Sequence, residues 1–193
     1  MKILSTACAN ALHFFYPAYC LHCDEKLKWP TKLICTECFQ QIEWIDRKQR
    51  CPNCFGPRRC KSCLPLHPHR SLFEATGPQA SLYSAFLQTK RPTLLASLIV
   101  LALSKTSWEM PQVIVPALNM PLASEDPAFI LAKEVAKLQG IPFALPSDQI
   151  EGKRVLLLVP SLSNGSHLFK EKKRLAGFFP AKIYTLAFID ERD

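Results

Sequence analysis

The stretch Val155-Leu156-Leu157-Leu158-Val159-Pro160-Ser161-Leu162-Ser163-Asn164-Gly165-Ser166 joins a continuous apolar run to a short polar loop. Five apolar residues in succession, 155–159, are typical of a strand that is buried on both faces of a sheet. The residues from Ser166 to Ala176 follow with helical spacing. A buried strand, a small polar loop and a helix in this order predict one unit of a parallel α/β sheet.

The segments on either side repeat this alternation of strand and helix. Buried strands are predicted over 113–116 and 182–189, and helices over 79–90, 92–104 and 127–139, the last ending at Gly140. We therefore predict an α/β fold with a small, mostly parallel sheet over 71–193. A smaller module over 1–70 precedes it, and the segment 64–69, rich in Pro and His, is expected to link the two.

The cysteines of the smaller module follow a regular spacing. Eight of the nine cysteines lie between residues 20 and 63 in four C-x-x-C pairs, which is the spacing of zinc knuckles. Sequential pairing would form two closed sites, the first from Cys20, Cys23, Cys35 and Cys38 and the second from Cys51, Cys54, Cys60 and Cys63. Interleaved pairing of the same cysteines stays open. Either way, the sequence predicts two structural Zn²⁺ ions held by thiolates alone.

Other uses of these cysteines fit the sequence less well. Disulfides suit secreted chains, a redox C-x-x-C is expected once beside a βαβ unit, and an iron–sulfur cluster uses the same thiolates. Four protein ligands leave no position for a reacting water, so each zinc site is expected to be structural. His22, His67 and His69 are expected at the surface, and Cys8 is expected to be a small buried apolar residue.

Length and composition limit the function classes. With 193 residues and 48% hydrophobic residues, the chain is long enough for one domain and a small module and too apolar for a disordered chain. The longest apolar run, 94–103, falls short of the about 20 residues that span a bilayer. The amino-terminal residues are expected to form a short amphipathic helix with Leu4, Ala7, Leu12 and Phe15 facing inward. Because no cleavage site for a signal peptide follows, a cytoplasmic protein is predicted.

The positive charge is concentrated in the cysteine-rich part. Residues 1–70 hold 11 Lys/Arg against 5 Asp/Glu, and the whole chain carries a formal net charge of +8. Two sites of four thiolates and one Zn²⁺ each would lower the total to about +4. The basic runs 47–50 and 58–61, with Trp29 and Trp44 nearby, could bind single-stranded nucleic acid. In the alternative interpretation the charges are a solvated surface and the tryptophans fill a small core.

The order of these parts resembles the competence protein F (ComF) family. The features that carry the resemblance are Phe14-Phe15-Tyr16-Pro17, the cysteine pairs, Ala75-Thr76-Gly77-Pro78 before a helix, and the strand–loop–helix core. The resemblance implies a double zinc ribbon joined to a type I phosphoribosyltransferase domain. It also implies phosphoribosyl pyrophosphate (PRPP) with Mg²⁺ as a ligand, and a role in DNA uptake or handling with single-stranded DNA or DNA-processing proteins as partners.

The core loop departs from the pattern of that family. There the strand runs into D-D-x-x-T-T-G-A-T, whose acids approach the ribose hydroxyls of PRPP and whose loop holds the 5′-phosphate. Aligned on Gly165, the acids become Val159 and Pro160, and the residues left of the loop are Ser163, Asn164, Gly165 and Ser166. An arginine-rich run of the family is replaced by neutral and acidic residues over 117–126. We therefore predict no catalytic residues and, at most, a residual phosphate loop.

Three classes of function follow from the sequence. The first is a ComF-like protein with a degenerate, non-catalytic transferase domain that handles DNA. The second is an active phosphoribosyltransferase with an altered PRPP site. The third is a zinc-ribbon module for protein interaction, in which the sheet is a scaffold and Ser163 simply caps the helix that follows it.

Overall fold

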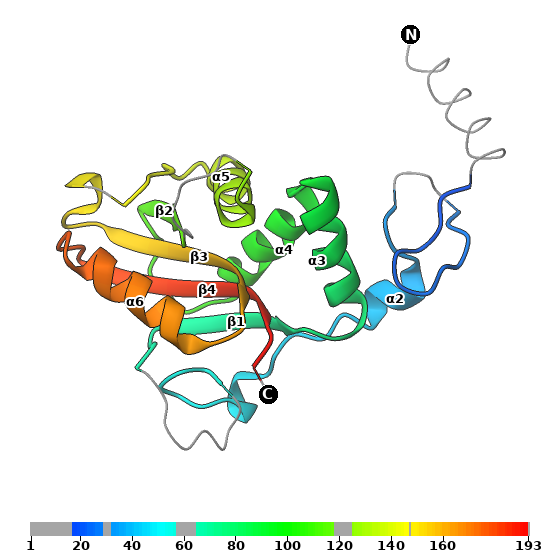
Figure 1. The fold of residues 1–193 in the computed structure, drawn as a ribbon, viewed down its shortest axis with the longest axis horizontal. Coiled ribbons are helices and arrows are strands. Elements are labelled where there is room, and N and C mark those ends of the chain that lie inside the picture. Colours follow the sequence, from blue (N-terminus) through cyan, green and yellow to red (C-terminus); the bar gives the residue numbers. More distant parts are fainter. Residues whose placement is uncertain (1–16, 29–31, 57–64, 118–124, 147, 193) are drawn as a thin grey trace, which may run out of the picture.

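The computed structural model describes residues 17–28, 32–56, 65–117, 125–146 and 148–192 (Figure 1). Four parallel strands form one sheet in the order β1-β4-β3-β2. Their bounds are β1 His69–Glu74, β2 Val113–Pro116, β3 Arg154–Leu162 and β4 Lys182–Asp190. The predicted α/β class with a small parallel sheet is therefore confirmed, and β2 spans the predicted residues.

The two central strands form the longest pairing in the sheet. β3 and β4 have nine residues each and pair in register from Arg154 opposite Lys182 to Leu162 opposite Asp190. Both faces of these strands are covered, so burial does not alternate along them as it does in a strand with one wet face. This explains why the sequence of β3 is a continuous apolar run and why it could be recognised.

Helices cover both faces of the sheet (Figure 1). One face carries α3 Gly77–Thr89, α4 Thr93–Ser104 and α5 Pro127–Gln139, whose apolar side chains share a core with Leu156 and Leu158. The other face carries α6 Gly165–Ala176. Leu157 lies in this second core together with Leu66, Cys51 and Cys54. Part of the cysteine-rich chain thus belongs to the cover of the sheet.

The edge strand β1 was not predicted. It opens at His69, within the predicted linker, and its polar residues interrupt the apolar pattern. His69 is only 5% exposed, so its expected place at the surface is wrong. One ring nitrogen lies 2.9 Å from Thr185 Oγ1 and the other 3.2 Å from Ser71 Oγ. Because these hydroxyls provide hydrogen bonds inside the core, a histidine can be buried there.

The chain passes the outer edge of β2 before it enters β3. Phe143 forms a single parallel bridge with Ile114, closed by hydrogen bonds of 2.9 Å from Ile114 N–H to the Pro142 carbonyl and 3.0 Å from Ala144 N–H to the Ile114 carbonyl. The short helix η2 Asp148–Ile150 follows, and Ile150 packs on the α6 face. A one-residue bridge here replaces a full edge strand. After this bridge the chain crosses from the face of the sheet that carries α5 to the face that carries α6.

The amino-terminal part packs along α3 and β1. It contains α2 Thr36–Gln40 and the 3-10 helix η1 Arg47–Gln49. The His22 ring lies 3.1 Å from Ser81 Oγ on α3, and the Trp44 ring lies 4.6 Å from that of Phe73 on β1. The expected helix with Leu4, Ala7, Leu12 and Phe15 lies outside the described residues. Within the described part of the chain, no helix is long and apolar enough to cross a membrane.

We predict that shortening a buried side chain of a central strand lowers the free energy of unfolding far more than shortening an exposed side chain of a helix. Leu156 is 0% exposed and Leu138 on α5 is 44% exposed. Leu156→Ala should lower the free energy of unfolding by about 2–5 kcal/mol, because it removes buried contacts and leaves a cavity. Leu138→Ala should change it by about 0.5 kcal/mol or less. Urea unfolding followed by circular dichroism measures both, and equal losses would contradict the described core.

Candidate functional site

Four thiols from two knuckles meet at one place. The Sγ atoms of Cys20, Cys23, Cys35 and Cys38 all lie within 4.8 Å of one another, and those of Cys23 and Cys35 are 3.8 Å apart. Four sulfurs around a tetrahedral Zn²⁺ at about 2.3 Å would lie roughly 3.8 Å from each other. The spacing of the thiols therefore fits a closed metal site, and the cysteines brought together are those of the first predicted set.

Backbone hydrogen bonds hold the two knuckles in place. A turn from Cys20 to Glu25 is closed by a 2.8 Å bond from Cys20 N–H to the Glu25 carbonyl, and Tyr19 bridges Lys26. Cys35 is the N-cap of α2, so its thiol and that of Cys38 lie on the first turn of one helix. The N–H of Cys35 donates to Cys20 Sγ at 3.3 Å. The two halves of the cluster are thus linked directly.

The electrostatics of the cluster favour one thiolate when no cation is bound. Burial acts to raise the pKa of the Cys20 thiol, but backbone N–H donors, among them that of Cys35, outweigh it and lower this pKa to about 6. Burial and the neighbouring thiols raise the pKa of Cys38. Four thiolates at these distances repel one another strongly. A divalent cation at their centre would offset that repulsion.

The second predicted set is described only in part. Cys51 and Cys54 are buried, whereas Cys60 and Cys63 lie outside the described residues. The N–H of Gly56 donates to Cys54 Sγ at 3.3 Å, and Phe55 N–H donates to the Cys51 carbonyl at 2.9 Å. This half has the turn of a knuckle. Cys8 also lies outside the described residues, and His22 and His67 are exposed as expected.

The loop of Ser163, Asn164, Gly165 and Ser166 follows the carboxyl end of β3, as predicted. Asn164 is the N-cap of α6, and its Oδ1 accepts hydrogen bonds from the N–H groups of Ser166 at 3.1 Å and His167 at 3.3 Å. The alternative in which Ser163 caps this helix is therefore wrong. The N–H groups that would hold a phosphate already have an acceptor.

No acid stands where the family would place its ribose-binding pair. Val159 is buried in the core beneath α6, and Pro160 is half-buried in the same strand. Asp126, which could have replaced an acid, instead caps α5 by accepting a 2.7 Å hydrogen bond from Ala128 N–H. Asp190, at the end of β4, is bound to Arg192. None of these four side chains is placed to orient a ribose.

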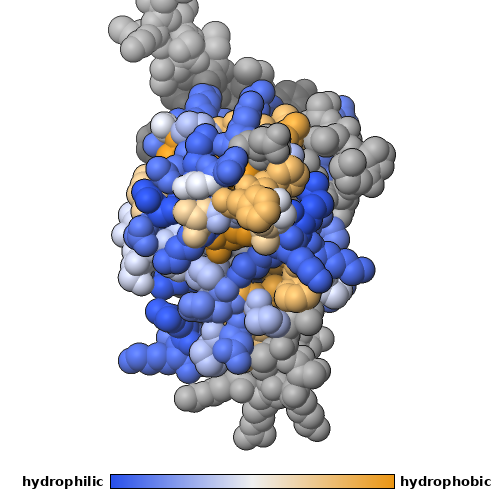
Figure 2. Space-filling view, turned by 90° about the vertical axis from the view of Figure 1, so that its left-hand side faces the viewer, coloured by the Kyte–Doolittle hydropathy of each residue, from blue (hydrophilic) through white to orange (hydrophobic). Residues whose placement is uncertain are grey.

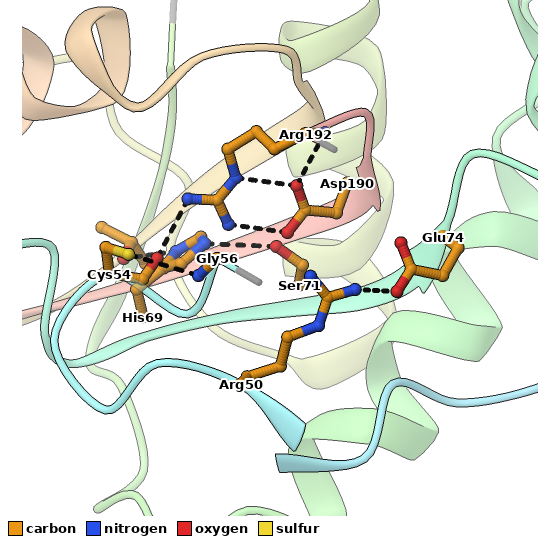
Figure 3. A network of polar contacts seen from close by, with 9 residues as sticks. Arg50, Cys54, Gly56, His69, Ser71, Glu74, Asp190 and Arg192 are labelled. Carbon is orange, nitrogen blue, oxygen red and sulfur yellow. Dashed lines mark hydrogen bonds and ion pairs between the residues drawn. The ribbon is translucent and has the colours of Figure 1, made fainter. Parts of the chain in front are cut away.

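A network of polar contacts joins the end of β4 to the cysteine-rich chain (Figure 3). Arg192 donates to both carboxylate oxygens of Asp190, at 2.8 and 2.6 Å, and to the Cys54 carbonyl at 3.0 Å. Burial alone would raise the pKa of Asp190, but the hydrogen bonds and the charge of Arg192 lower it. Nothing in the local sequence indicated this pair, because its role depends on Cys54, far away along the chain.

The basic residues differ in their exposure. The Arg50 side chain is 7% exposed and forms an ion pair with Glu74 (Figure 3), so its expected place in an exposed basic cluster is wrong. Arg47 and Lys48 are exposed as predicted. The run 58–61 and Trp29 lie outside the described residues. Trp44 contacts Phe73 with one side of its ring but remains 36% exposed, so it does not fill a core as the alternative interpretation predicts.

Comparisons with known proteins give little guidance. No family model matches the chain, and no curated protein matches it. One matching solved structure is the "HGPRT-ase from Leishmania tarentolae in complex with GMP", at 16% sequence identity and a TM-score of 0.35. The match covers 58% of this chain and 68% of that one. It is too weak to decide the function of this chain.

We predict that the first four cysteines hold one metal ion. Elemental analysis of protein purified without chelators should find two Zn²⁺ per chain, because both sets have knuckle spacing. The double variant Cys20→Ser with Cys38→Ser should retain one ion, and the control Cys8→Ser should retain two. Chelation should unfold the cysteine knuckles while the helices and strands of the sheet domain persist in circular dichroism. One ion or none in the unmodified protein would contradict this prediction.

We also predict that the Asp190–Arg192 pair stabilises the fold in a pH-dependent way. Asp190→Asn should cost about 3–5 kcal/mol at pH 7, because it leaves a buried guanidinium without its partner. Because the folded pKa of Asp190 is lowered, its contribution is fully present above the unfolded value near 3.8 and is lost as the pH falls further. Urea midpoints of the unmodified protein and of Asp190→Asn, measured from pH 7 to pH 2, should therefore differ by a constant amount down to about pH 5 and approach each other below pH 4. The exposed Glu151→Gln serves as control, and a difference that stays constant over the whole range would contradict the assignment.

Proposed function

We propose that this chain is a zinc-binding protein of the ComF kind, whose degenerate phosphoribosyltransferase-like domain is a non-catalytic module for handling single-stranded DNA. The observation that carries the non-catalytic part is at the end of β3. There Val159 is buried in an apolar core, and Asn164 occupies the N–H groups of the following helix. The resemblance in sequence order supports the family and the DNA-related role.

The zinc part of the proposal rests on the four clustered thiols. Cys20, Cys23, Cys35 and Cys38 would hold the first ion, and Cys51 and Cys54 would supply half of the ligands of the second. A zinc ion held by four thiolates has no position left for water, so it would serve structure and not catalysis. Three of the four cysteines of the first set are buried. This is the environment of a structural site.

The chemistry of phosphoribosyl transfer needs groups that this loop lacks. The reaction develops positive charge on the ribose while pyrophosphate leaves, so it depends on carboxylates that orient the hydroxyls and on donors that hold the phosphates. The side chain of Val159 accepts no hydrogen bond, and Pro160 lacks an N–H group. Each lost contact of this kind typically raises the barrier by about 2.7–4 kcal/mol. An active enzyme with an altered site is therefore the weaker alternative.

A second candidate is a module for protein interaction, which the surface near the four thiols favours. Leu33 is 47% exposed and Phe39 is 53% exposed, and both line a groove of about 680 Å³ between α2 and the start of α4. Exposed apolar side chains that gather in a groove are typical of contact surfaces. This groove does not include the described basic residues 47–50, which were predicted to bind nucleic acid.

The proposal predicts that the unmodified protein does not bind PRPP. Isothermal titration with PRPP and Mg²⁺ should show millimolar or weaker affinity, because Val159 and Pro160 stand in place of the two acids and Asn164 already accepts from the N–H groups of Ser166 and His167. The variant Val159→Asp with Pro160→Asp restores the acids of the family pattern and is titrated beside it, with circular dichroism as a check of folding. The same titrations without Mg²⁺ are the control. Tight, Mg²⁺-dependent binding by the unmodified protein would favour the active-enzyme alternative.

A further inference from the structure

A pocket of about 360 Å³ opens at the amino-terminal edge of the sheet, away from the loop after β3. His69 and Lys182, the first residues of β1 and β4, line it, as does Trp108 just before β2. In Figure 2 this edge faces the viewer, and hydrophilic side chains surround a smaller apolar area. β3 separates this edge from the loop at Ser163 by eight residue steps of about 3.3 Å, roughly 26 Å in all.

Two arginines in this pocket have no acidic partner. Arg47 comes from η1 and Arg70 from β1, and both line the pocket. Among the residues that the structure describes, neither forms an ion pair with a carboxylate. Burial lowers the pKa of Arg70, and the positive charge of Arg47 lowers it further. Two guanidinium groups of like charge in a partly buried pocket would be stabilised by an anion.

The acidic residue of the pocket does not neutralise these arginines. Glu109 lies 3.5 Å from the ammonium of Lys182 and 3.8 Å from the guanidinium of Arg154. Its charge is therefore shared between two other cations. The pocket as a whole remains positive, with Arg47 and Arg70 as the uncompensated pair.

Aromatic rings form the wall beside the arginines. Trp108 stacks on Tyr184 with ring centres 5.0 Å apart and planes inclined by 23°, and the Arg70 guanidinium lies 5.5 Å from the centre of the Trp108 ring. Tyr184 is 1% exposed, and within the described residues its hydroxyl has no hydrogen-bond partner of normal geometry.

We propose that this pocket binds a nucleotide unit, with Arg47 and Arg70 on its phosphate and the Trp108–Tyr184 wall beside its base or sugar. Guanidinium groups suit phosphate because they donate two parallel hydrogen bonds to it. The volume lies at the lower end of the range for small-ligand sites, which is enough for one nucleotide. The same chemistry is present in a free mononucleotide and in a single strand. Assignment to a single strand rests on the proposed DNA-handling function.

The experiment measures three probes by isothermal titration with zinc-loaded, full-length protein: inorganic phosphate, thymidine 5′-monophosphate and an oligothymidylate of about ten nucleotides. The test variant is Arg47→Gln with Arg70→Gln. Lys173→Gln is the matched control, because Lys173 is an exposed cation on α6 and removing it changes the net charge without touching this pocket. Arg47→Gln alone is the second variant. It changes an exposed side chain and so keeps the test valid if the double variant is unstable.

We expect the monophosphate to bind more tightly than inorganic phosphate. The double variant should lose at least about tenfold in affinity for it, because two charge-assisted contacts are removed. The affinity of Arg47→Gln alone should lie between those of the unmodified protein and the double variant, and the affinity of Lys173→Gln should match that of the unmodified protein. If the single strand binds as well, its affinity should fall with salt and be lost in the same variants.

Each contrary outcome has a separate meaning. Absence of binding by all three probes, or equal affinities in the unmodified protein and the double variant, would overturn the proposal that this pocket binds a nucleotide. Single-strand binding that persists in the double variant would overturn the pocket and leave the proposed DNA handling in place. Monophosphate binding that is lost in the variant, without any single-strand binding, would support the pocket and contradict DNA handling.

Discussion

The structure depends on the burial of β3 and β4 on both faces. Two nine-residue apolar strands need a cover on each side, and the helices α3, α4 and α5 supply only one of them. α6 covers part of the other face, and Leu66, Cys51 and Cys54 complete it. The cysteine-rich chain is therefore not an appendage of the sheet. Its second knuckle contributes Cys51 and Cys54 to the core on this face of the sheet.

The carboxyl and amino-terminal edges of the sheet differ in whether their polar side chains already have partners. At the carboxyl edge, Asn164 caps α6, Asp126 caps α5 and Arg192 holds Asp190, so these three polar groups already have partners. In parallel α/β sheets ligands usually bind at this edge. At the amino-terminal edge, the guanidinium groups of Arg47 and Arg70 lie beside an aromatic wall and have no carboxylate partner among the residues that the structure describes. The proposed binding site at the amino-terminal edge is therefore independent of the loop at the carboxyl edge.

The first set of knuckles combines a cluster of thiols with apolar side chains, among them Leu27 and Ile34, that are buried in the main core. The thiols of the first set lie on a turn and on the first turn of α2, and backbone N–H groups point at the sulfurs. Such an arrangement favours negative charge on sulfur and is completed by a cation. The exposed Leu33 and Phe39 beside it add an apolar surface to a site whose interior is polar.

The sequence by itself determined the elements whose signal is local. Strands β2, β3 and β4 were recognised from apolar runs, α5 from its periodicity and terminal Gly140, and the cysteine knuckles from their two-residue spacing. Only the tertiary structure decided the rest. β1 carries His69 and Ser71 inward because Thr185, more than a hundred residues away, bonds the imidazole. Arg50 meets Glu74, and Arg47 meets Arg70, because the strand order places β1 beside the cysteine-rich chain. Periodicity and spacing are properties of neighbours in sequence, whereas the partners of buried polar groups are set by which segments the sheet brings together.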